Sequence, residues 1–168
     1  MGNFCCSPKQ KKMEYSLLPG TRIFSVYNNN KFYLASHQYY DKDKVNANSI
    51  LLIVHDNWKM HGMNFDVLYS KDGIRYSYKD NVYGMKDWKL YIDKFKGENV
   101  PVFHRFNSSY FRQEKYDDNT FLIKEINSNL YLKIDNKKLR DYDKWGTSYY
   151  VGLCSDRNQA SKWISFTK

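Results

Sequence analysis

The chain has 168 residues, of which 42% are hydrophobic and 18% aromatic, and its formal net charge is +9 at pH 7. This length and composition exclude a mainly disordered chain and predict one folded domain with a substantial core. The longest apolar run, residues 50–54, has only the length of a strand, which excludes a membrane-spanning helix. The positive charge favours acidic partners such as anionic lipid, nucleic acid or acidic protein surfaces, without choosing among them.

The first seven residues, MGNFCCS, carry the most specific signal. Removal of Met1 exposes Gly2, the acceptor of the N-myristoylation pattern, although that pattern has Ser or Thr where this chain has Cys6. One myristoyl chain binds a membrane with only about 10⁴ M⁻¹, so stable anchoring needs a second signal. Cys5 and Cys6 lie beside that first acyl chain, and we predict that both carry palmitate. With only three cysteines in the chain, a disulfide scaffold is not expected, and a reducing compartment is favoured.

Three lysines follow the cysteines, and these are Lys9, Lys11 and Lys12. Each lysine adds about 1 kcal/mol of attraction when it lies at an anionic leaflet. Residues 7–20 are polar and basic, and we predict that they form a linker that gives the domain some reach from the bilayer. Segment 1–19 is therefore predicted to be an acylated basic anchor.

This MG…CC start resembles the dually acylated N-termini of many small eukaryotic membrane-anchored proteins. Among them are the inner membrane complex sub-compartment proteins of apicomplexan parasites, which are similar in size. The resemblance covers only these first residues. It implies a lipid-anchored protein on the cytoplasmic face of a membrane, either the plasma membrane or the inner membrane complex.

A weak internal repeat follows the linker. Its first and last copies both combine a strand, an Asn-rich turn and an apolar-Tyr-Leu triplet. Asn suits a tight hairpin turn because it tolerates positive φ. The matches hold one spacing of about a hundred residues, or twice a repeat of about fifty. The matched segments are 23–34 with 121–132, 49–57 with 148–156, and 65–68 with 163–166.

A middle copy is predicted between these two. Residues 74–84 supply a strand, an Asp-Asn turn and an apolar-Tyr pair, and strands are expected at 100–106 and 110–115. Pro101 indicates a strand start or an edge strand. The predicted domain spans residues 20–168, and its three copies cover about 21–72, 73–120 and 121–168.

Three copies of a four-strand unit resemble a β-trefoil of the fascin and hisactophilin type. Those intracellular proteins bind actin, and hisactophilin is itself myristoylated. The resemblance implies an all-β domain that recruits a cytoskeletal or membrane-skeleton partner. Hisactophilin is crowded with histidine, whereas this chain has four, so its pH-sensing mechanism is not carried over.

A second fold stays open at the C-terminal end of the chain. Residues 154–164 could form a helix capped by Ser155 or Asp156, with Trp163 in the core. A terminal helix of this kind closes the pleckstrin-homology barrel, the fold of the apicomplexan sub-compartment proteins. That alternative implies a domain that binds phosphoinositides or other acidic lipids and organises a membrane sub-compartment. Residues 164–166 alternate like a strand, which favours the trefoil.

The sequence contains no established catalytic or metal-binding pattern. It has no phosphate-binding glycine loop and no G-x-S-x-G motif. His55 and His61 have no cysteine at ligand spacing, and residues 41–45 only begin like a calcium loop. Cys154 lies in an apolar stretch and is predicted to be a structural thiol. We therefore expect no enzymatic activity, no cofactor and no metal.

Two basic clusters are candidates for binding an acidic partner. Lys137, Lys138 and Arg140 lie in a predicted loop that could contact acidic lipid headgroups or an acidic protein, or could simply be solvated. Basic residues interleaved with aromatics also suit single-stranded nucleic acid, but a membrane-held chain makes nucleic acid an unexpected partner. The second cluster comprises Lys86, Lys89, Lys94 and Lys96, interleaved with Trp88, Tyr91 and Phe95. Taken together, the sequence predicts a non-catalytic scaffold held at a membrane by its N-terminus.

Overall fold

The computed structural model describes residues 15–37, 49–55, 64–80, 85–95, 97–142 and 146–167. The predicted acylation sites and the three N-terminal lysines lie outside this part of the chain. Within it, the protein is all-β, and twelve strands pair antiparallel in one sheet system. None of the described residues belongs to a helix that is both long and apolar enough to cross a membrane.

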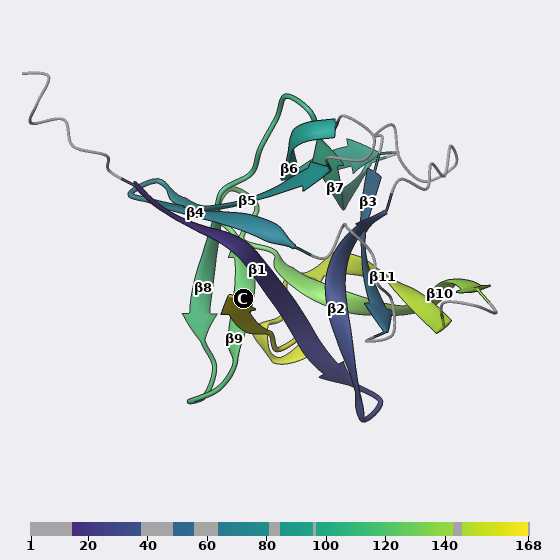
Figure 1. Ribbon diagram of the computed structural model, residues 1–168. Helices are drawn as coiled ribbons and strands as arrows, with labels where there is room; N and C mark the ends of the chain where they lie inside the picture. The colour runs from purple at the N-terminus through teal and green to yellow at the C-terminus, as the bar shows by residue number, and fades with distance from the viewer. Residues whose placement is uncertain are drawn as a thin grey trace, which may run out of the picture.

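The strands fall into three successive groups of four (Figure 1). The first group is β1 (Tyr15–Tyr27), β2 (Asn30–His37), β3 (Ser49–His55) and β4 (Phe65–Ser70). The second is β5 (Gly73–Asp80), β6 (Met85–Phe95), β7 (Glu98–His104) and β8 (Phe111–Lys115). The third is β9 (Phe121–Glu125), β10 (Tyr131–Tyr142), β11 (Gly146–Cys154) and β12 (Ile164–Thr167). These groups match the three predicted copies, except that β1 begins at Tyr15, inside the predicted linker.

The outer strands of each group pair with those of the next group. β1 pairs with β4, β4 with β5, β5 with β8, and β8 with β9. Phe121 at the start of β9 exchanges two backbone hydrogen bonds with Trp163, of 3.0 and 2.8 Å. Trp163 immediately precedes β12, and β12 pairs with β1. The path of pairings therefore returns to the strand where it began.

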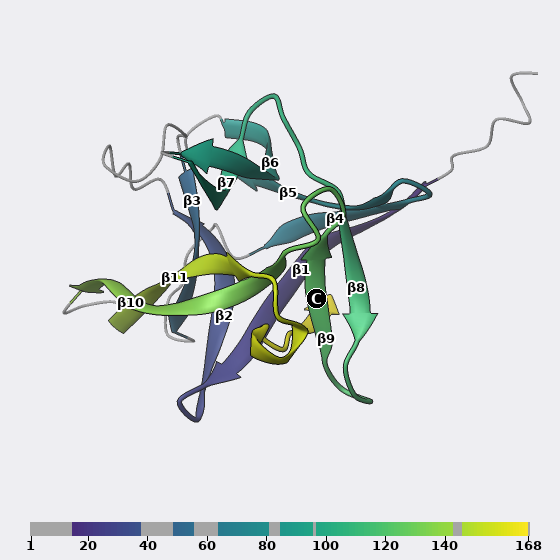
Figure 2. The same cartoon turned by 180° about the vertical axis from the view of Figure 1, so that it is seen from behind.

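The inner strands of each group form hairpins. β2 pairs with β3, β6 with β7, and β10 with β11 (Figure 2). β3 also pairs with both β7 and β11, so the three hairpins are joined to one another. The molecule thus consists of a ring of outer strands and three linked hairpins.

The core contains corresponding residues from all three groups. Most of the buried positions along the strands are apolar. Leu34, Leu90 and Leu132 come from the second strand of each group and are at most 3% exposed. The first strands contribute Ile23, Tyr76 and Ile123, and the fourth strands or their starts contribute Phe65, Phe111 and Trp163. The repeat detected in the sequence is therefore a repeat of core positions.

The predicted Asn-rich turns are confirmed. Asn28 and Asn29 join β1 to β2 with φ of 48° and 63°. Asn129 in the connection from β9 to β10 has φ of 59°. Asn adopts such values more readily than most residues because its short side chain bonds locally. The same turn chemistry thus starts the first and third groups.

The C-terminal segment does not form the α-helix that the pleckstrin-homology alternative needs. Arg157–Gln159 form a three-residue 3₁₀ helix, and the Asp156 side chain accepts a hydrogen bond from the Asn158 N–H at 2.9 Å. Asp156 is therefore a helix cap, as predicted, but the helix ends after one turn. β12 then begins at Ile164, and Trp163 is fully buried without the α-helix in which a core Trp163 was expected.

Pro101 lies within β7 rather than at its start. Its position is opposite Ile92 of β6. On the other side of β7, the pairing with β3 involves Phe103 and Val102 and goes no further toward Pro101. Proline is accommodated there because its missing N–H removes no bond to β3.

Candidate functional site

The predicted binding segment 136–140 belongs to a strand, so the expectation of a loop was wrong. Lys138 lies opposite Tyr149 of β11, and Arg140 lies opposite Ser148. The register shifts on both sides of Lys138, which marks irregular, bulged pairing. A loop was expected because runs of charged residues are typical of loops, whereas here they lie at the irregular end of a hairpin. The side chains of Lys137, Lys138 and Arg140 lie outside the described part, and their binding role stays a prediction.

The basic and aromatic cluster on β6 is split between the two faces of that strand. Trp88 and Leu90 point into the core and are 6% and 2% exposed. Lys89 faces outward, and its Nζ donates to the backbone oxygen of Arg105 at 3.5 Å. Tyr91 lies on the same side as Lys89, with its ring centroid 5.4 Å from that of His104. Trp88 therefore belongs to the core, and Tyr91 lies on the outer face. Lys89 forms a hydrogen bond with the connection between β7 and β8.

The connection from β7 to β8 is held by side chains at both of its ends. His104 Nδ1 accepts hydrogen bonds from the backbone N–H groups of Phe106 and Asn107, at 3.1 and 2.9 Å. Ser109 donates its N–H to the Leu90 oxygen at 2.9 Å, and its Oγ accepts from Ile92 N–H at 2.9 Å. These bonds fix the backbone around Phe106, which is 79% exposed. The sequence analysis missed this feature.

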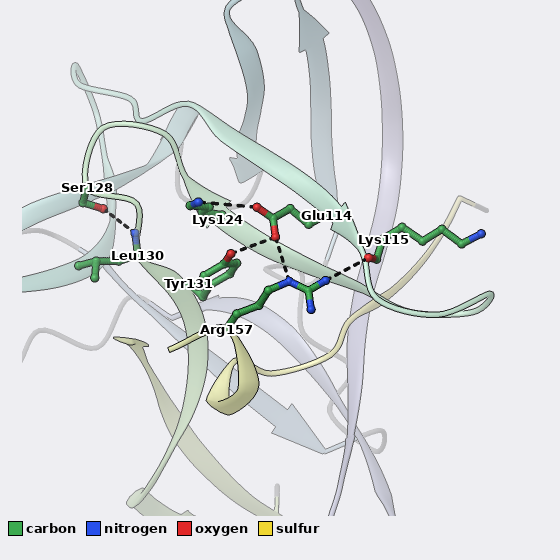
Figure 3. A network of polar contacts seen from close by, with 7 residues as sticks. All are labelled: Glu114, Lys115, Lys124, Ser128, Leu130, Tyr131 and Arg157. Carbon is green, nitrogen blue, oxygen red and sulfur yellow. Dashed lines mark hydrogen bonds and ion pairs between the residues drawn. The ribbon is translucent and has the colours of Figure 1, made fainter. Parts of the chain in front are cut away.

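A polar network joins the second and third groups of strands (Figure 3). The Glu114 carboxylate accepts from the Tyr131 hydroxyl at 3.0 Å and from Arg157 Nε at 3.4 Å. Its other oxygen forms an ion pair with Lys124 Nζ at 3.7 Å. Arg157 also donates to the Lys115 backbone oxygen at 3.3 Å. Lys124 and Arg157 thus both bind Glu114, and Arg157 also binds the backbone. We call this structural contact between the two groups of strands the clasp.

Cations also cover Tyr116, next to this clasp. Lys162 Nζ lies 4.1 Å and the Arg157 guanidinium 5.6 Å from the centre of the Tyr116 ring. The following turn is built on Asp117, whose Oδ1 accepts from the N–H groups of Asn119 and Thr120 at 2.9 and 2.7 Å. These hydrogen bonds, the one from Asn119 foremost, lower the pKa of Asp117. The cations here therefore lie against an aromatic ring, and the Asp117 carboxylate serves the backbone of its own turn.

Cys154 has the surroundings of a structural thiol, as predicted. It is half-buried and packs against the small core formed by Leu122, Tyr131 and Ala160. Burial raises the pKa of its thiol, an effect that Lys133 only partly offsets. Its Sγ lies 3.4 Å from the Asp156 backbone oxygen. A raised pKa lowers the thiolate fraction at neutral pH, which disfavours a nucleophilic role.

Glu125 ends β9 as a buried carboxylate. It is 4% exposed, its Oε1 accepts from the Ser128 N–H at 3.2 Å, and its Oε2 has no hydrogen-bond partner among the described residues. Burial raises the pKa of Glu125, and the hydrogen bond from Ser128 offsets part of that rise. The folded state therefore holds this proton more tightly than the unfolded chain does.

A pH titration tests this consequence. Between the ordinary pKa of Glu125 and its raised value, the folded state binds more protons, so stability should fall as pH rises. Replacing Glu125 by glutamine should remove this fall, because the side chain can no longer ionise. We expect the Tm of Glu125→Gln, relative to wild type, to increase as the pH rises above the ordinary glutamate pKa of about 4.3. A constant difference across that range, or one of the opposite sign, would contradict the assignment.

No group of three or more metal-ligating side chains comes together in the described part of the chain. Of the two histidines considered as metal ligands, the structure describes only the backbone of His55, at the end of β3. His61 and residues 41–45 lie outside the described ranges.

Comparisons with known proteins show the fold and no family. No family model and no curated protein matches the chain. A solved Caenorhabditis elegans protein of unknown function matches with a TM-score of 0.64 and 11% identity, covering 94% of this chain and 98% of that one. The SDF2-like protein from Arabidopsis thaliana matches with a TM-score of 0.60 and 13% identity, covering 90% and 95%. The architecture of the whole described chain is therefore one that these two proteins share.

Proposed function

We propose that this protein is a non-catalytic binding module held at the cytoplasmic face of a membrane by N-terminal acyl chains. The observation that carries the proposal is the MGNFCCS start, separated by a short basic segment from a domain that begins at Tyr15. Gly2 carries myristate, and Cys5 and Cys6 carry palmitate. Lys9, Lys11 and Lys12 direct the segment toward an anionic leaflet.

The folded part is a β-trefoil in this proposal. The support comes from three groups of four strands, from the pairing path that returns to β1, and from the core residues repeated in each group. β-Trefoils close their edges in this way, which limits edge-to-edge association of exposed strands. The three linked hairpins then supply the surface that meets a partner.

A cytoskeletal or membrane-skeleton protein is the partner that we propose, by resemblance to the fascin and hisactophilin type. Co-sedimentation with filamentous actin tests this part separately from the anchor. Recovery of the full chain with filaments at low salt supports it, and no recovery removes actin from the list of partners. The alternative, binding of acidic lipid headgroups by Lys137, Lys138 and Arg140, predicts liposome binding without any acyl chain.

Membrane fractionation in a eukaryotic cell tests the anchor. We expect wild type to pellet with membranes and Gly2→Ala to become soluble, because palmitate is added only after the first acyl chain brings the protein to a membrane. The Cys5→Ser, Cys6→Ser double variant should be held only loosely and be released by washing. Equal behaviour of all three proteins would contradict the proposal.

A further inference from the structure

The connection between β7 and β8 presents an aromatic side chain to solvent. Phe106 is 79% exposed, more than any other large hydrophobic side chain in the described part of the protein. An isolated exposed apolar residue is ordinary on a protein surface, so exposure alone assigns no role. Its surroundings are what distinguish Phe106.

The backbone that carries Phe106 is rigidly held. Two N–H groups, those of Phe106 and Asn107, donate to the ring nitrogen of His104, and Ser109 ties the far end of the connection to β6. Lys89 donates to the Arg105 backbone oxygen. A fixed backbone reduces the conformational entropy that is lost when the side chain docks.

The described charged groups in contact with Phe106 or its connection are positive. The Arg105 guanidinium lies 5.6 Å from the centre of the Phe106 ring, and Lys89 reaches the Arg105 oxygen at 3.5 Å. The sequence from residue 99 to residue 113 contains no aspartate or glutamate. An aromatic tip with basic neighbours matches the region between headgroups and acyl chains of an anionic bilayer, where aromatic rings and cations are both favoured.

The far end of this connection, at Tyr110, lies near the turn between β4 and β5, beside which β1 begins. Tyr15 pairs with Ser70, and Ser70 pairs with Gly73 across the turn between β4 and β5 (Figure 1). A Cβ at Gly73 would lie 3.1 Å from the Cβ of Tyr110, at the end of the connection. A chain from Gly2 to Tyr15 can span at most about 45 Å, which limits how far an anchored N-terminus lets the domain lie from its membrane.

We propose that Phe106, flanked by Arg105 and Lys89, inserts into the headgroup region of an anionic membrane as a second contact that needs no acyl chain. The inference deepens the proposed function, because it gives the anchored domain a defined orientation. Arg105 and Lys89 would attract the anionic headgroups, and the Phe106 ring would insert among them.

Binding of the full-length, unacylated protein to vesicles tests this inference. Phosphatidylcholine vesicles with and without phosphatidylserine are pelleted with wild type, Phe106→Ser, Phe106→Trp and Val26→Ser. Val26, in β1, is 61% exposed and serves as the matched control for loss of an exposed apolar side chain. We expect wild type to prefer the phosphatidylserine vesicles and Phe106→Ser to lose about tenfold in partitioning. Phe106→Trp should retain binding, since Trp favours the interface, and Val26→Ser should match wild type.

Two results would overturn the inference. One is that wild type ignores phosphatidylserine vesicles, and the other is that Phe106→Ser partitions like wild type. If Lys137, Lys138 and Arg140 changed together to glutamine abolish binding while Phe106→Ser does not, the contact lies on β10 instead. The protein in this test carries no acyl chain. A negative result would therefore overturn only the Phe106 contact, and the fractionation of Gly2→Ala would still decide the acyl anchor. A Tm equal to that of wild type confirms that each variant is folded.

Discussion

Replacing Trp163 by alanine should cost about 3–5 kcal/mol of unfolding free energy. The Trp163 side chain is 0% exposed and packs in the main core, so its removal leaves a large cavity. Its backbone also bonds Phe121 in both directions and connects β9 with the start of β12. Since small domains have an unfolding free energy of only about 5–15 kcal/mol, this one change should remove a large share of it. Urea unfolding followed by circular dichroism measures the loss.

Trp163→Phe is the matched control. The Trp163 Nε1–H has no hydrogen-bond partner in the described part of the structure, so phenylalanine loses volume but no polar contact. We expect it to cost clearly less than alanine. If Trp163→Ala unfolds at the same urea concentration as wild type, Trp163 does not occupy the core position assigned to it.

Gly73→Ala is the second change with a large expected effect. Gly73 has φ of 132°, which side chains rarely adopt. A Cβ there would lie 2.7 Å from Ile126 Cδ1 and 3.1 Å from the Phe111 backbone oxygen. Backbone strain and overpacking each cost about 1–3 kcal/mol, so the loss should reach about 2–6 kcal/mol.

Gly97→Ala separates these two causes. Gly97 also has positive φ, 81°, but no atom lies within 4 Å of its Cβ position among the described residues. It therefore incurs only the backbone strain, and its loss of stability should be about 1 kcal/mol. Equal losses in the two variants would show that the close approach of Gly73 to β8 and to Ile126 contributes nothing.

Much of the architecture is predictable from the sequence because local signals agree with it. Asn28, Asn29 and Asn129 have positive φ, which Asn tolerates, and apolar strand segments lie on either side of them. The match of residues 49–57 with 148–156 located β3 and β11, which pair directly with each other. These signals depend on neighbours in sequence, and a single sequence contains them.

Other features depend on residues that only the fold brings together. Glu114 meets Arg157 across 43 positions of sequence, and no spacing rule links the two. The cap at Asp156 was found, but the short 3₁₀ turn after it was not, since the backbone becomes extended at Ala160 and Ser161 N–H bonds the distant Leu132 oxygen. Phe106 was overlooked because residues 100–106 were expected to form one strand, whereas β7 ends at His104.

The central claim is that acyl chains hold this domain at a membrane. Metabolic labelling of the full chain in a eukaryotic cell, with alkyne analogues of myristate and palmitate, tests it most directly. The account predicts myristate label that Gly2→Ala abolishes. It also predicts palmitate label that hydroxylamine releases and that the Cys5→Ser, Cys6→Ser double variant lacks. Absence of both labels from wild type, in cells where a known acylated protein is labelled, would contradict it.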